Sequence, residues 1–152
     1  MSLVLRVSRR FSAQPERVFD AWTSPAVLRE WWAANPAWDG ADAEVDLRPG
    51  GRYRLGMRDT ESGAVHVVAG EYTEVDRPNR LAYTWTWEDE PAEMRGSEGS
   101  LVVVEFVADG DGTVVLITHS GFAGDEIRDM HAVGWASCLD NLERRVLRRS
   151  PA

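Results

Sequence analysis

The sequence contains no lysine, and all seventeen of its basic residues are arginine. Schiff-base chemistry and catalysis by a lysine general base are therefore excluded, because both require an amine side chain. The formal net charge is −8, and no basic stripe with interleaved aromatic residues offsets it. A protein that binds nucleic acid follows the phosphates with positive charge, so we expect no nucleic-acid partner.

Cysteine and long apolar segments are also scarce. Cys138 is the only cysteine, so no internal disulfide can form, which agrees with a reducing compartment. No apolar run approaches the roughly 20 residues that span a membrane, and the N-terminus lacks the pattern of a signal peptide. We therefore expect a cytoplasmic protein without a membrane partner, and its length predicts one domain over residues 1–152.

Tryptophan, by contrast, is abundant, with seven residues in a chain of 152. Six of them gather in two places: Trp22, Trp31, Trp32 and Trp38 in the first part of the chain, and Trp85 and Trp87 near its middle. Rings of this size either fill a core or line a pocket.

The spacing of apolar residues predicts the order of the elements. Alternating apolar and polar residues predict strands over Leu3 to Phe11, Arg52 to Arg58, Val65 to Val75, Arg80 to Trp87, Leu101 to Val107 and Thr113 to His119. Two short helices follow the first strand, one beginning near Pro15 and one over Ala26 to Trp32. From Asp125 the apolar residues recur at helical spacing over about twenty residues. We interpret the acidic connection from Glu88 to Gly99 as a mobile lip.

This order predicts an α+β fold, in which a curved antiparallel sheet of six or seven strands wraps around the last helix. Several short motifs support the same fold: Glu30-Trp31-Trp32, Pro49 to Arg54, Gly70-Glu71-Tyr72, Arg77 to Leu81, Thr118 to Phe122 and Gly134-Trp135. Together, from about Phe11 to Leu142, they resemble the family named after the activator of heat-shock-protein-90 ATPase, within the START-like superfamily. The resemblance implies a helix-grip fold with a cavity between the sheet and the long helix.

The leading hypothesis is that this cavity binds a small hydrophobic or aromatic molecule. We expect a pocket of about a few hundred cubic ångströms. The predicted walls are Trp32, Tyr53, Met57, Trp85, Phe106, His119, Met130 and Trp135. Gly134 lies before Trp135 on the expected buried face of the helix, either for close packing or to leave room for a ligand.

A second hypothesis is an enzyme that uses His119 as an acid or base on a hydrophobic substrate, since imidazole titrates near neutrality. His119 shares its predicted strand face with Val115 and Ile117, a position more typical of a core histidine. The three histidines show no metal-binding spacing, so we expect neither a metal nor a cofactor. Cys138 is predicted to be small core filler.

The third hypothesis is a regulator that contacts a chaperone, as the family resemblance implies. The sequence leaves the oligomeric state open, a homodimer included.

Overall fold

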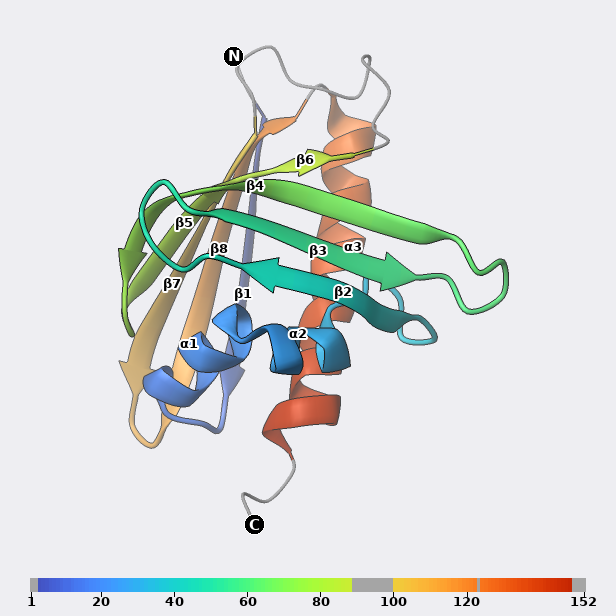
Figure 1. The fold of residues 1–152 in the computed structure, drawn as a ribbon. Helices are drawn as coiled ribbons and strands as arrows, with labels where there is room; N and C mark the ends of the chain where they lie inside the picture. The colour runs from blue at the N-terminus through green and yellow to red at the C-terminus, as the bar shows by residue number, and fades with distance from the viewer. Residues whose placement is uncertain (1–2, 89–99, 123, 149–152) are drawn as a thin grey trace.

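The computed structural model describes residues 3–88, 100–122 and 124–148. It has the predicted α+β helix-grip fold, in which an open antiparallel sheet curves around the long helix α3 (Asp125–Leu142) (Figure 1). Two short helices, α1 (Pro15–Thr23) and α2 (Pro25–Trp31), follow the first strand and cover one end of the sheet. A single π-helical turn, η2 (Glu143–Leu147), continues α3. The predicted lip over residues 88–99 lies, apart from Glu88, outside the described residues.

The sheet has eight strands when the two-residue β6 is counted. The strands are β1 (Leu3–Phe11), β2 (Asp39–Val45), β3 (Arg52–Arg58), β4 (Val65–Asp76), β5 (Arg80–Thr84), β6 (Thr86–Trp87), β7 (Leu101–Asp109) and β8 (Gly112–Phe122). Their order is β1-β8-β7-β5-β4-β3-β2, and β6 pairs with β4 beside β5. No helix in the described ranges combines the length and the apolar content needed to cross a membrane.

Strand β2 was not predicted from the sequence. Its composition, Asp39-Gly-Ala-Asp-Ala-Glu-Val45, is poor in β-branched and aromatic residues. The strand forms because β3 pairs with it and α2 packs against it: Ala43 lies opposite Leu55 and is 3% exposed. The guanidinium of Arg29 in α2 also donates a hydrogen bond to the Ala43 carbonyl, at 3.2 Å.

The predicted strand from Arg80 to Trp87 is divided at Trp85. The part before it, β5, pairs with β4 at Tyr72 and beyond, whereas β6 pairs with Val68 and Ala69. Gly70 lies at the point where β4 changes partner, and a Cβ atom there would be 2.0 Å from the Thr84 carbonyl oxygen. Only glycine allows this approach, so the break that turns Trp85 into the interior is built into the sequence.

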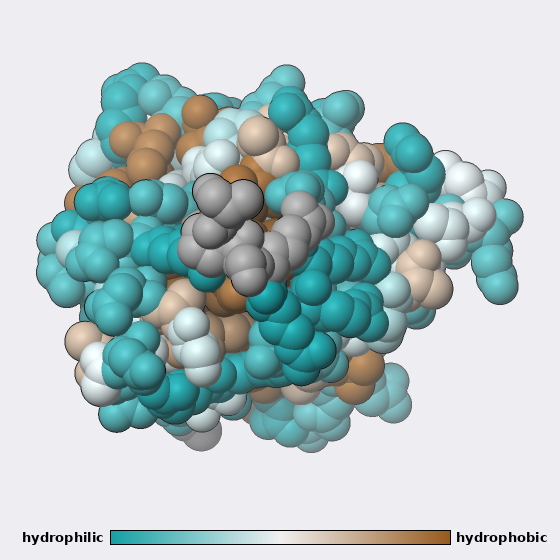
Figure 2. All heavy atoms as spheres, turned by 90° about the horizontal axis from the view of Figure 1, so that it is seen from below, coloured by the Kyte–Doolittle hydropathy of each residue, from teal (hydrophilic) through white to brown (hydrophobic). Residues whose placement is uncertain are grey.

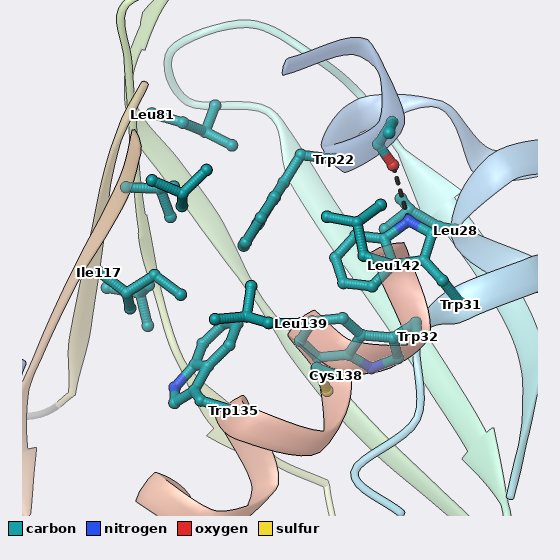
Figure 3. Packing of buried hydrophobic residues seen from close by; sticks show 14 of the residues in the cluster. Trp22, Leu28, Trp31, Trp32, Leu81, Ile117, Trp135, Cys138, Leu139 and Leu142 are labelled. Carbon is teal, nitrogen blue, oxygen red and sulfur yellow. Dashed lines mark hydrogen bonds between the residues drawn. The ribbon is translucent and has the colours of Figure 1, made fainter. Parts of the chain in front are cut away.

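The core lies between the concave face of the sheet and the three helices (Figure 3). Trp31 of α2 is fully buried, and its indole N–H donates to the Ala21 carbonyl oxygen at 2.9 Å. Its ring packs edge to face against Trp22 and Trp32, with centroids 5.1 and 5.7 Å away. These contacts fix α1 and α2 to each other.

The surface is mainly hydrophilic on the face at the end of α3, where hydrophobic residues appear only in separate patches (Figure 2). Arginine–carboxylate pairs are common on the molecule, for example Arg10 with Asp109 at 2.9 Å and Arg77 with Asp20 at 2.9 Å. Exposed pairs of this kind contribute about 0–1 kcal/mol each, so the buried rings carry most of the stability.

Candidate functional site

A small hollow lies at the predicted location, between the sheet and α3. It is lined by residues from the segment that follows α2, from β3, from β6 and the residue before it, and from α3: Trp32, Ala34, Met57, Trp85, Trp87, His131, Gly134, Trp135 and Cys138. We call it the tryptophan hollow. Its volume is about 20 Å³, which is enough for about one water molecule.

Within the described part of the chain, this hollow is far smaller than the expected pocket of about a few hundred cubic ångströms. Three large rings occupy the space instead. Trp32, Trp85 and Trp135 lie against one another with centroids 5.5 to 5.9 Å apart. Sequence patterns give the faces on which such rings lie, but not whether the rings meet across the space between them.

Four of the predicted wall residues line the hollow, namely Trp32, Met57, Trp85 and Trp135. His119 lies directly behind them, with its ring centroid 4.9 Å from that of Trp85.

Two other predicted wall residues are buried elsewhere in the core. Tyr53 packs against Tyr72 and Tyr83, and Phe106 packs against Phe19 and Trp22. Burial raises the pKa of Tyr53, so its hydroxyl stays protonated and donates to the Thr84 carbonyl. Neither residue lines the hollow in this structure.

The prediction that Met130 faces the interior is wrong. Its side chain is 58% exposed, because it lies on the outer side of α3. His131, the next residue, lines the hollow instead. The signal for His131 was present in the sequence: His131 and Trp135 are four residues apart and Cys138 follows three later, so all three share one helix face.

His119 is held in a chain of hydrogen bonds that uses both ring nitrogens. Trp135 Nε1–H donates to His119 Nδ1 at 3.1 Å. Because an indole can only donate, Nδ1 is unprotonated and Nε2 carries the hydrogen. His119 Nε2–H donates to Ser100 Oγ at 2.8 Å, and that hydroxyl donates to the Ser120 carbonyl at 2.9 Å. Burial, with a smaller contribution from His131, lowers the pKa of His119 to about 2, so this fully buried ring is neutral.

His131 is arranged in the same way at the edge of the hollow. Its Nδ1–H donates to the Ile127 carbonyl at 2.8 Å, and its Nε2 accepts from Trp87 Nε1–H at 3.0 Å. Burial lowers the pKa of His131, so this ring too is held in the neutral form. Cys138 is buried as predicted, and burial raises the pKa of its thiol to about 12, which leaves it unreactive as a nucleophile.

Two indole N–H groups at the hollow stand apart from the rest. Trp32 and Trp85 are 2% and 5% exposed, yet neither Nε1 has a hydrogen-bond partner within the described part of the chain. Leaving a buried donor unpaired costs about 1–3 kcal/mol. Both rings line the hollow, and Figure 3 shows Trp32 next to Trp135 and Cys138 of α3.

The part of α3 over the hollow is less firmly packed than the rest of the helix. From residue 125 to residue 134 the side chains are at most partly buried, His131 among them, whereas Trp135, Cys138, Leu139, Asn141 and Leu142 are fully buried. The N-cap, Gly124, has no side chain to cap the first turn. The second half is anchored by Asn141, whose side-chain amide donates to the Ala33 carbonyl at 3.1 Å. The first half of α3 is therefore the part of the wall that can move at least cost.

A larger depression, of about 540 Å³, lies at the surface of β2 to β6. Its charged lining consists of Glu44, Glu71 and Glu88 with Arg52 and Arg54, and Arg54 is paired with Glu88 at 2.7 Å. Opposite charges of nearly equal number give it no strong preference for an ion. Among the described residues, no three potential ligands from His, Cys, Asp and Glu come together as a metal site would require.

The curved sheet around one long helix defines a helix-grip protein, and a sequence comparison gives the family. The profile of the family described as "Activator of Hsp90 ATPase homolog 1-like protein" matches residues 12–146. The chain therefore belongs to this family, as its motifs predicted. None of the curated proteins compared with the chain matches it significantly.

Solved structures from several organisms have the same fold. Protein CV1439 from Chromobacterium violaceum is 26% identical, with a TM-score of 0.82 and coverage of 97% of this chain and 98% of that one. A protein from Rhizobium leguminosarum is 29% identical, with a TM-score of 0.77 and coverage of 98% and 97%. An HSP90 activator from Plasmodium falciparum is 26% identical, with a TM-score of 0.70 and coverage of 93% and 94%.

Proposed function

We propose that this chain binds a small hydrophobic or aromatic molecule in the tryptophan hollow. The observation that carries the proposal is the pair of buried, unpartnered indole N–H groups in a wall made almost entirely of aromatic and sulfur-containing side chains. A core that only packs would satisfy such donors, as it does for Trp31 and Trp135. Ligand pockets, in contrast, combine an apolar wall with a few polar groups that wait for the ligand.

The hollow must widen to admit such a molecule. Its wall contains three features that allow this: the weakly packed first half of α3, the flexible side chain of Met57, and Gly134, which leaves the helix surface open. Gly134 costs about 1 kcal/mol of helix stability relative to alanine. Packing alone explains it poorly, because a Cβ atom there would meet only Ala34, at 3.4 Å.

The binding test places a larger side chain at Gly134, so that it occupies the hollow. We expect N-phenyl-1-naphthylamine, an uncharged fluorescent aromatic probe, to bind the purified protein at one saturable site. In Gly134→Leu, the new side chain occupies the hollow, and we expect affinity to fall about tenfold or more, the scale of displacing one or two ligand methylene groups. The measurement is a fluorescence titration, with thermal melting to show that both proteins are folded.

The matched control is Ala136→Leu, two residues further along the same helix. Ala136 is exposed and does not line the hollow, so the same added side chain should change probe affinity less than twofold. Equal affinity in wild type and Gly134→Leu, or the absence of saturable binding, would contradict the proposal.

A chaperone-associated role is a second candidate that we propose. It is favoured by membership of the family and by the likeness to the Plasmodium falciparum HSP90 activator along most of both chains. If it is correct, saturating amounts of this chain should raise the ATPase rate of the purified chaperone from the native host at least about twofold. An unchanged rate would remove this candidate and leave ligand binding untouched.

Acid–base catalysis by His119 receives the least support. The imidazole is fully buried, and both of its nitrogens are engaged with Trp135 and Ser100. A general acid or base needs a nitrogen within reach of the substrate proton. This arrangement suits a residue that positions the Trp135 ring better than one that exchanges protons.

A further inference from the structure

The two unpartnered indoles restrict the kind of atom that the hollow accepts. Trp32 Nε1–H and Trp85 Nε1–H can only donate hydrogen bonds. The indole of Trp87 and both nitrogens of His131, at the edge of the same hollow, are already engaged, with each other and with the Ile127 carbonyl. The free hydrogen-bonding capacity of these rings therefore consists of donors, and the complementary group on a ligand is an acceptor.

The charge of the wall indicates that this acceptor is neutral. None of the nine residues that line the hollow is arginine, aspartate or glutamate, and the histidine among them carries no proton on Nε2, because that nitrogen accepts a hydrogen bond from the Trp87 indole. A carboxylate or phosphate placed there would lose its hydration without gaining a cationic partner, which is strongly unfavourable. An uncharged oxygen avoids that cost, and a carbonyl oxygen offers two lone pairs to two donors.

The shape of the wall indicates what carries the oxygen. Trp32 and Trp85 lie with their centroids 5.9 Å apart and their planes at 65°, and Trp135 faces both. Flat aromatic ligands fit such tilted rings because they can make edge-to-face and offset contacts with them.

We infer that the hollow selects small aromatic molecules that carry an uncharged carbonyl oxygen, which accepts hydrogen bonds from Trp32 and Trp85. The inference rests on the proposed function, because it names the ligand class of the same site. In this role the two indoles do more than pack: they distinguish a ligand with a carbonyl oxygen from a ligand of the same shape with a carbon in that place.

The test compares acetophenone with α-methylstyrene, in which a CH₂ group replaces the carbonyl oxygen with little change of shape. Each compound is titrated against the complex of the protein with N-phenyl-1-naphthylamine. We expect acetophenone to displace the probe at an about tenfold lower concentration, which corresponds to one or two hydrogen bonds formed by otherwise unpaired donors. In Trp32→Phe and in Trp85→Phe, this preference should fall to about threefold or less, with the α-methylstyrene affinity nearly unchanged.

Two further measurements separate the outcomes. Trp38→Phe removes an indole N–H outside the hollow and should keep the full preference. In ¹⁵N-labelled wild-type protein, acetophenone but not α-methylstyrene should shift the indole signals of Trp32 and Trp85, which requires no variant to fold. Equal displacement by both compounds would overturn the inference and leave the proposed function standing. If the probe itself fails to bind, the proposed function fails first.

Discussion

Replacing Trp31 by alanine should lower the free energy of unfolding by about 3–5 kcal/mol, the range found for removing a large buried aromatic side chain. Trp31 is 0% exposed, and it packs between Trp22 and Trp32. The substitution also leaves the Ala21 carbonyl without the hydrogen bond it accepts from the indole. Urea denaturation of both proteins at pH 7 measures the difference.

The control is Met130→Ala, which also shortens a large apolar side chain. Met130 is 58% exposed, so the change should stay within about 0.5 kcal/mol. If the two substitutions cost the same, α2 is not fixed to the core as described here. The comparison also tests whether Met130 lies on the outer side of α3. Truncating an inward-facing methionine would lower the free energy of unfolding by about 2–5 kcal/mol.

Most of the fold could be predicted from local patterns. The bounds of β1 and β3 agree with their predicted ranges, and Pro15 and Pro25 begin the two short helices. The inward direction of His119 also followed from alternation with Val115 and Ile117. These features depend on the period of the side chains and on turn chemistry, both of which a sequence contains.

The features that local patterns missed are those that depend on distant parts of the chain. The residues of β2 have little intrinsic preference for a strand, and pairing with β3 supplies it. The division of β5 from β6 depends on Gly70, because only a glycine there leaves space for the Thr84 carbonyl. Gly70 lies fourteen residues before Thr84, the end of β5. In both places tertiary contacts decide the structure.

The position of the hollow was predicted, and four of the eight predicted wall residues line it. Alternation correctly assigned Met57 and Trp85 to the concave face of the sheet. On the helix, the face was misplaced by one residue, which exchanged Met130 for His131. Hydrogen-bond satisfaction cannot be read from a sequence at all, so the contrast between the unpaired Trp32 and the paired Trp31 became visible only in three dimensions.

The second large effect is a loss of folding stability as the pH falls below neutrality. The pKa of His119 in the folded protein is about 2, below its ordinary value of 6.5, because burial disfavours the charged ring. As the pH falls, the unfolded chain therefore binds a proton before the folded protein does. The stability that His119 contributes as a neutral ring is complete above about pH 6.5 and is lost as the pH falls from there toward 2. Burial lowers the pKa of His131 as well, which adds to the loss with the same sign.

We expect the wild-type protein to lose about 1.4 kcal/mol of stability per pH unit from His119 alone once the pH is below about 6. His119→Gln should cost about 1–2 kcal/mol at pH 7, because it disturbs the bonds to Trp135 and Ser100. The variant lacks the titrating ring, so its stability should approach that of the wild type between pH 7 and pH 5. Urea denaturation at half-unit pH steps over this range measures both curves.

His66→Gln is the control, because it removes a histidine that stacks on Trp38 outside the hollow and leaves His119 and His131 in place. It should still lose the stability that depends on the neutral rings of His119 and His131 as the pH falls from 7 to 5. A constant gap between wild type and His119→Gln would mean that His119 accepts a proton in the folded state over this range. That result, together with unchanged stability of the variant at pH 7, would restore His119 as a candidate acid or base, since a proton that exchanges without unfolding is what such catalysis needs.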